Sequence, residues 1–225
     1  MKKKIFFNDT CGHKISATLS SISNKMVPIV ILFHGLNYGK DSNANRALEK
    51  IFLEHNFATL DVDFFSCGES VGNSDERNVK EFVENVLSAI KFLKEKGYTK
   101  LAIYGCSFGG VASVIAASKN SDLSVMALKA PGMGQKSRKL SNYKNDFDTK
   151  SWIKAGTKVK IPTLIVHGSK DEEVELQFSK DLAKSIKNSK LEIIKGADHR
   201  FTKKEDFDRC IKLLAEFIII TINKI

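Results

Sequence analysis

The stretch Gly105-Cys106-Ser107-Phe108-Gly109 places a serine between two glycines, directly after an apolar run at 100–104 that is typical of a β-strand. A helix pattern rich in small residues follows at 111–117. Strand, sharp turn and helix are the context in which a G-x-S-x-G segment presents a serine hydroxyl at the end of a sheet. Larger residues than Gly105 and Gly109 would collide with such a turn. The stretch therefore predicts that Ser107 is a nucleophile, although a chance pentapeptide in a loop is the alternative.

A serine hydroxyl is a poor nucleophile at neutral pH, so Ser107 needs a base, and that base needs a partner to orient it. In this arrangement the acid and then the histidine follow the serine along the chain. Two later apolar runs, at 161–168 and 191–196, each end in glycine. Asp171 follows the first run and His199 follows the second. Both therefore lie just beyond the carboxyl ends of strands, where open α/β sheets bind ligands.

The acid at Asp171 has competitors in the sequence, namely Glu172, Glu173, Asp198, Asp146 and Asp148. Asp198 is adjacent to the histidine, and neighbouring side chains diverge too much to make a good orienting pair. Asp146 and Asp148 follow the strand pattern at 124–129 and remain the alternative pair. We favour Asp171 as the acid and His199 as the base.

Attack on an acyl carbonyl creates a negatively charged oxygen that fixed backbone N–H groups stabilise. One donor is normally the residue after the nucleophile, which here is Phe108, and the second comes from a loop after an early strand. The apolar run at 28–33 is followed by His34-Gly35-Leu36, so we expect Leu36 to be the second donor. His34 and His167 each precede a glycine at a strand end, where we expect them to fix the turn by hydrogen bonding.

Strand and helix patterns alternate along the chain, which indicates a mainly parallel sheet covered by helices on both faces. An antiparallel pair at 3–7 and 14–19 opens the chain. Length and pattern together favour one domain over residues 1–225. The further strands are expected at 29–33, 58–63, 124–129, 161–166 and 191–194, and helices at 41–55, 78–96, 176–187 and from 204 onward.

These residues together resemble the α/β-hydrolase superfamily over nearly the whole chain. The matching segments are the His34-Gly35 loop, the turn at 105–109, His167-Gly168 with Asp171, and 196–199; in the segment at 63–70 only the Gly68-x-Ser70 end matches. The finer resemblance is to small bacterial carboxylesterases of the monoacylglycerol-lipase and cinnamoyl/feruloyl-esterase type. It implies the α/β-hydrolase fold and a short cap insertion at about 132–160.

The cap segment is short, polar and basic, which is expected to leave the serine open to bulky water-soluble esters. Candidate residues for the substrate pocket are Met133, Tyr143, Phe147 and Trp152, with local packing of the cap as the alternative for each. Between Met133 and Lys160 the chain carries eight lysines and arginines against two aspartates. We favour a solvated basic surface here over a rim that attracts anions.

The net charge of +10 raises the question of nucleic-acid or membrane binding. The sequence carries no zinc-finger spacing, RNA-recognition motif or helix-turn-helix pattern, so we expect no nucleic-acid partner. The apolar segment at 217–220 is too short to span a bilayer, which argues against stable membrane insertion. A homodimer is an arrangement that the sequence allows.

The four cysteines are widely spaced without a Cys-x-x-Cys pair, so we expect no metal site. The expected triad chemistry implies no organic cofactor either. The apolar run at 5–7 is too short for the core of a signal peptide. We therefore expect reduced thiols and a cytoplasmic location.

The sequence thus predicts a serine hydrolase that cleaves a small-molecule carboxylic ester through a Ser-His-Asp triad and an acyl-enzyme. Peptidase or thioesterase activity would use the same machinery. A third hypothesis is a non-catalytic ligand-binding protein with this fold, because fold alone does not establish function.

Overall fold

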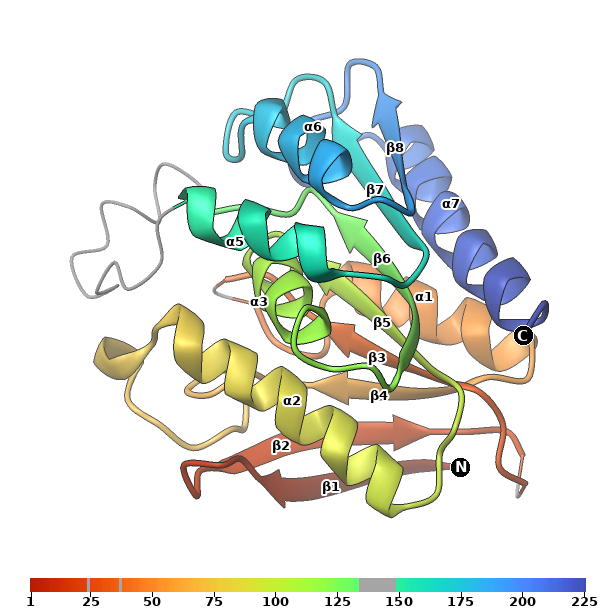
Figure 1. The fold of residues 1–225 in the computed structure, drawn as a ribbon. Coiled ribbons are helices and arrows are strands. Elements are labelled where there is room, and N and C mark those ends of the chain that lie inside the picture. The colour runs from red at the N-terminus through yellow and green to blue at the C-terminus, as the bar shows by residue number, and fades with distance from the viewer. Residues whose placement is uncertain (24, 37, 134–148) are drawn as a thin grey trace.

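One eight-stranded sheet runs through the computed structural model, which describes all residues except 24, 37 and 134–148 (Figure 1). The strand order is β1-β2-β4-β3-β5-β6-β7-β8. The strands are β1 (Lys2–Asn8), β2 (Lys14–Ser20), β3 (Ile29–Phe33), β4 (Ala58–Val62), β5 (Leu101–Cys106), β6 (Leu123–Lys129), β7 (Thr163–Gly168) and β8 (Ser189–Ile194). β1 is antiparallel to β2 and β2 to β4, whereas all other neighbours are parallel. The predicted fold class and the opening antiparallel pair are confirmed.

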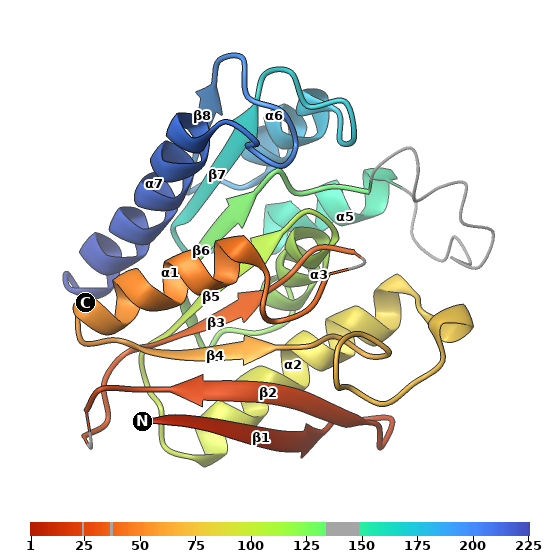
Figure 2. The ribbon, with the colours of Figure 1, turned by 180° about the vertical axis from the view of Figure 1, so that it is seen from behind.

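Helices cover both faces of this sheet. The face in front in Figure 1 carries α2 (Val79–Glu95), α3 (Phe108–Ala117), α5 (Thr149–Ala155) and α6 (Leu176–Ser185). The opposite face, in front in Figure 2, carries α1 (Asn43–Glu54) and α7 (Lys204–Ile222). Two short 3₁₀ helices, η1 (Ser74–Glu76) and η2 (Gly156–Lys158), complete the described helices. Alternate residues of the central strands supply the two apolar clusters that these layers bury.

Local chemistry sets several element boundaries. The Ser42 side chain accepts the backbone N–H of Asn45 and starts α1. Asn78 caps α2 in the same way by accepting the N–H of Glu81. β7 begins at Thr163 rather than at the predicted residue 161, because Pro162 has no N–H to donate to the strand ladder.

The apolar carboxyl-terminal segment lies in α7, which packs onto the back face of the sheet (Figure 2). Ile218 and Ile222 are completely buried in the cluster that also contains alternate residues of β3 and β5. Over the described residues, no helix has both the length and the apolar character needed to cross a membrane. Within the segment at 217–220, Ile218 and Ile219 therefore belong to the protein core, whereas Ile220 is exposed.

We expect Ile218→Ala to lower the free energy of unfolding by about 2–5 kcal/mol, because it removes buried methyl and methylene groups and leaves a cavity. Ile220, on the same helix, is 52% exposed and serves as the matched control. Ile220→Ala makes the same change in helix propensity and should alter stability by less than about 0.5 kcal/mol. Urea unfolding of both variants measures the difference, and equal losses would contradict the packing of α7.

Candidate active site

Ser107 occupies a tight turn between β5 and α3, with a backbone φ of 50° that is unusual for any residue except glycine. Its N–H donates to the Lys129 carbonyl at 2.8 Å, which fastens the turn to β6. A Cβ atom added at Gly105 would lie 2.8 Å from the Gly109 carbonyl oxygen, and one added at Gly109 would lie 2.3 Å from the His34 carbonyl oxygen. Both positions therefore require glycine, as the sequence predicts.

The structure brings His199 and Asp171 to Ser107, although the three residues follow three different strands. His199 lies in the loop after β8, and its Nε2 is 3.1 Å from the Ser107 Oγ. Asp171 follows β7, and its Oδ2 is 2.7 Å from the His199 Nδ1. An ionised carboxylate only accepts hydrogen bonds, so Nδ1 carries the proton and Nε2 faces the serine as an acceptor.

Asp171 is held by hydrogen bonds on both carboxylate oxygens. Oδ1 accepts the backbone N–H groups of Glu173 (2.9 Å) and Val174 (2.8 Å). Oδ2 lies 2.7 Å from His199 Nδ1 and 3.0 Å from His167 Nε2. Burial raises the pKa of Asp171, but the hydrogen bonds from His167 and His199 outweigh burial and bring the pKa well below its ordinary value. Asp171 is therefore an ionised acceptor at neutral pH.

Two buried histidines fix the turns beside this site, as expected from their positions before glycines. The His167 Nε2 faces the carboxylate of Asp171, so it is the donor, and its Nδ1 accepts from the Ser179 hydroxyl at 2.7 Å. The His34 Nε2 accepts the N–H of Phe64 at 3.1 Å, and its Nδ1 donates to the Gly35 carbonyl at 2.7 Å. Burial lowers the pKa of His34 to about 4, so this ring is neutral.

The two residues predicted to supply the oxyanion donors flank Ser107. Phe108 is the first residue of α3 and follows the serine directly. Leu36 lies in the loop after β3, and a Cβ added at the preceding Gly35 would lie 3.3 Å from the Ser107 Cβ. The loop thus passes against the serine turn, which is the placement that a second backbone donor needs.

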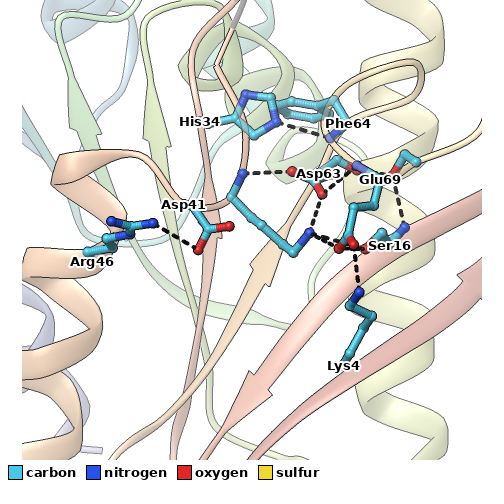
Figure 3. Close-up of polar contacts among 10 residues, drawn as sticks. Lys4, Ser16, His34, Asp41, Arg46, Asp63, Phe64 and Glu69 are labelled. Atoms are coloured by element: carbon cyan, nitrogen blue, oxygen red, sulfur yellow. Dashed lines mark hydrogen bonds and ion pairs between the residues drawn. The ribbon is translucent and has the colours of Figure 1, made fainter.

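The loop after β3 is held by a cluster of charged side chains around the buried Lys40 and Asp63, which the sequence did not reveal (Figure 3). The Lys40 ammonium contacts the Asp63 Oδ2 and lies 2.7 Å from the Glu69 Oε2 and 3.3 Å from the Ser16 Oγ. The Lys40 and Asp63 side chains are 7% and 1% exposed. Hydrogen bonds from Lys4 and Lys40 lower the pKa of Glu69 to about 2, so the Glu69 carboxylate is ionised at neutral pH.

Residues 34 and 40 are both tied to the end of β4, so the loop between them is held at its two ends. His34 accepts from the N–H of Phe64, and the N–H of Lys40 donates to the Asp63 Oδ1 at 2.7 Å. A Cβ at Gly68 would lie 2.4 Å from the Asp63 carboxylate, so the glycine of the Gly68-x-Ser70 segment makes room for this anchor.

A second buried lysine lies beneath the histidine loop. Lys129, at the end of β6, is 4% exposed. Its ammonium donates to the His199 carbonyl oxygen at 3.0 Å and lies 4.7 Å from the centre of the Phe201 ring. Phe201 has a φ of 57°, so the turn after His199 is tight. Lys129 therefore joins the strand beside the nucleophile to the loop that carries the imidazole.

The predicted pocket residues fall in different environments. Trp152, in α5, is completely buried in the apolar cluster on the α2 and α3 side, and the half-buried Met133 packs against that cluster. The environment of Trp152 agrees with the alternative expectation of local packing. A role in the substrate pocket stays a prediction for both Trp152 and Met133. Four predicted or alternative residues lie outside the described residues, namely Tyr143, Phe147, Asp146 and Asp148.

Comparison with known families and structures gives a consistent pattern. Residues 26–216 match a family described as an alpha/beta hydrolase domain. No curated protein sequence matches this chain significantly.

Several solved structures share the fold at low sequence identity. A structure described as ferulic acid bound to Est1E from Butyrivibrio proteoclasticus has a TM-score of 0.83 and 22% identity, covering 97% of this chain and 99% of that one. An esterase domain of a Rhodothermus marinus protein has a TM-score of 0.78 and 16% identity, with 99% and 100% coverage. The Pyrococcus furiosus esterase Pf2001 has a TM-score of 0.79 and 17% identity, with 97% and 89% coverage.

We expect Lys40→Met to lower the free energy of unfolding by about 3–5 kcal/mol, because it leaves the buried Asp63 carboxylate without its charge partner. Arg46→Met is the matched control, since Arg46 and Asp41 form an exposed pair at 3.7 Å (Figure 3). Loss of an exposed pair should cost less than about 1 kcal/mol. Urea unfolding compares the two, and a similar effect of both variants would contradict the anchoring role of Lys40.

The depressed pKa of Asp171 predicts a pH-dependent contribution to stability. A carboxyl whose folded pKa lies below its unfolded value of about 3.9 stabilises the fold above that pH, and the contribution is lost progressively as the pH falls from there through the folded pKa. The stability difference between the wild type and Asp171→Asn should therefore shrink by about 1 kcal/mol between pH 5 and pH 3. Urea unfolding at both pH values tests this, and a constant difference would contradict it.

Proposed function

Because this chain belongs to the α/β-hydrolase family, we propose that it is a serine hydrolase that cleaves carboxylic esters through an acyl-enzyme intermediate. The observation that carries the proposal is the continuous contact from Ser107 Oγ through the His199 imidazole to the Asp171 carboxylate, at 3.1 and 2.7 Å. A nucleophile, a base and an orienting acid in this order form the arrangement that activates a serine.

In the first half of the reaction, the Ser107 Oγ attacks the ester carbonyl while the His199 Nε2 takes its proton. Asp171 keeps the imidazole in the tautomer that accepts at Nε2 and stabilises the imidazolium that forms. The tetrahedral intermediate collapses when His199 gives the proton to the leaving alcohol, and the acyl group stays on Ser107. Water then attacks the acyl-enzyme with His199 again as the base, which releases the acid and restores the serine.

The backbone N–H groups of Phe108 and Leu36 stabilise the negative charge that develops on the carbonyl oxygen. Phe108 is positioned by the serine turn itself, and Leu36 by the loop that His34 and Lys40 tie to the end of β4. Donors that are fixed before the substrate arrives need no reorganisation during the reaction, which is the source of their effect. Loss of one such donor typically costs about 10²–10³ in kcat.

The choice of an ester over an amide or thioester rests on the structural neighbours. Est1E binds ferulic acid and Pf2001 is an esterase, and both align with nearly all of this chain. Small-molecule esters are therefore the substrates to screen first, with aromatic acyl groups included.

We expect Ser107→Ala to lower kcat on short p-nitrophenyl esters by about 10⁴-fold or more, because the nucleophile itself is removed. Ser118→Ala serves as the control, since the Ser118 hydroxyl donates to the Ile115 carbonyl at the end of α3 that is remote from Ser107. Thermal unfolding establishes that both variants are folded. Full turnover by Ser107→Ala would refute the proposal. A folded wild type that neither turns over esters nor is labelled at Ser107 by a fluorophosphonate would point to a ligand-binding protein instead.

A further inference from the structure

The turn between β1 and β2 is built around the carboxylate of Asp9. Oδ1 accepts the backbone N–H groups of Cys11 (3.0 Å) and His13 (2.8 Å), and Oδ2 lies 3.0 Å from the Asn85 Nδ2. Gly12 permits the turn with a φ of 86°. Asp9 is 6% exposed, so a carboxylate is held in a fixed orientation inside the turn.

Alternate residues of this turn direct a carboxylate, a thiol and an imidazole toward one another. One ligand atom from each of Asp9, Cys11 and His13 lies within 4.8 Å of the other two. The His13 Nδ1 is 3.0 Å from the Asp9 Oδ2. These are the oxygen, sulfur and nitrogen donors that Zn²⁺ accepts in proteins.

A fourth donor comes from the first turn of α2. The Glu81 Oε2 lies 3.5 Å from the His13 Nδ1, and the Glu81 Oε1 lies 4.0 Å from the Cys11 Sγ. The Oε2 atom is buried and has no hydrogen-bond partner among the described residues. Its one ion-pair contact among the described residues is with the His13 Nδ1 at 3.5 Å, so a cation placed between this oxygen and the turn would compensate for its burial.

The local charge is negative before any ion binds. Besides Asp9 and Glu81, a third carboxylate lies at the turn: that of Glu84, which accepts from the Thr10 hydroxyl at 2.7 Å. Within the described part of the chain, His13 is the one basic side chain at ion-pair distance from Asp9 or Glu81. A divalent cation placed among these carboxylates would relieve their mutual repulsion and favour the Cys11 thiolate.

We propose that Asp9, Cys11, His13 and Glu81 form a binding site for a divalent transition-metal ion, with Zn²⁺ as the best match to the donor set. In a tetrahedral zinc site, bond lengths of about 2.0 Å to N and O and 2.3 Å to S separate the donors by about 3.3–3.5 Å. The His13 Nδ1 lies 3.0 Å from the Asp9 Oδ2 and 3.5 Å from the Glu81 Oε2, close to this range. The Cys11 Sγ is farther away, at 4.0 Å from the Glu81 Oε1 and within 4.8 Å of the Asp9 and His13 donors. Cys11 is exposed, so its side chain is able to close these longer distances.

The ion would link the β1–β2 turn to α2, and four protein donors would complete its coordination. Such a closed site is structural rather than catalytic. A cavity of about 340 Å³ adjoins it and is lined in part by His13, Phe65, Arg77 and Glu81, which gives a solvent ion a path to the donors. Both ribbon views place the β1–β2 turn and the beginning of α2 on the same side of the molecule (Figures 1 and 2).

The test is a calorimetric titration of the full chain with Zn²⁺, after removal of bound metal with a chelator. We expect one equivalent to bind with release of the Cys11 thiol proton, which appears as a dependence of the heat on the buffer. Cys11→Ser, His13→Gln and Glu81→Gln should each weaken binding at least ten-fold. His55→Gln, which changes an exposed histidine on α1, should bind as the wild type does.

Two measurements keep the proposal falsifiable if a variant folds poorly. Thermal unfolding in chelator compares the metal-free variants with the wild type, and Zn²⁺ should raise the wild-type Tm. The wild-type Co²⁺ complex should show a thiolate-to-metal charge-transfer band. Absence of stoichiometric Zn²⁺ binding, a Co²⁺ complex without that band, or undiminished binding by Cys11→Ser and His13→Gln would each overturn the site. None of these readouts depends on ester hydrolysis.

Discussion

The backbone conformation of Ser107 is the constraint around which the rest of this molecule is arranged. A φ of 50° at a residue with a side chain costs on the order of 1–3 kcal/mol, and it persists only because the surroundings determine it. The N–H of Ser107 is bound to β6, and the flanking glycines contact backbone from β3 and α3. The close approach of these elements is what holds the hydroxyl away from the sheet, where a base can reach it.

Parallel strands explain how distant residues come to this one point. β3, β5, β7 and β8 all end at the same edge of the sheet, so the loops that follow them carry Leu36, Ser107, Asp171 and His199 together. Loops at such an edge are not rigid by themselves. Here buried polar groups hold them: Lys40 and Asp63 hold the first loop, and Lys129 holds the carbonyl of His199. Burying these ammonium groups requires close partners, and each partner lies on a neighbouring segment.

Much of this arrangement can be predicted from the sequence because it depends on local motifs. The turn at 105–109, and an acid and a histidine just after glycine-terminated strands, each depend on only a few neighbouring residues. The alternation of strand and helix patterns also predicts the sheet, because the spacing of apolar residues indicates whether one face or both faces of an element are buried. The sequence predicts the ends of the strands and helices less well: β7 begins at Thr163, after Pro162, rather than at residue 161.

The parts that the sequence did not reveal depend on pairs of segments that only the fold brings together. Lys40 and Lys129 look like ordinary surface lysines in the sequence, and nothing local indicates that Asp63 or the His199 carbonyl faces them. The same is true of the donors around Asp9. The cysteine spacing argued against a metal site, whereas the site that we propose is built from alternate residues of one turn and a glutamate on α2 and has no Cys-x-x-Cys pair to detect.

The two borders of the sheet bear on how this chain meets other copies of itself. β1 is one border and presents Lys2, Lys3 and Lys4 in succession, with Lys2 and Lys4 held by Glu49 and Glu69. β8 is the other and carries the charged pair Lys190 and Glu192. Lysines on a border strand disfavour its pairing with a strand of another molecule, which discourages continuous sheets and fibrils.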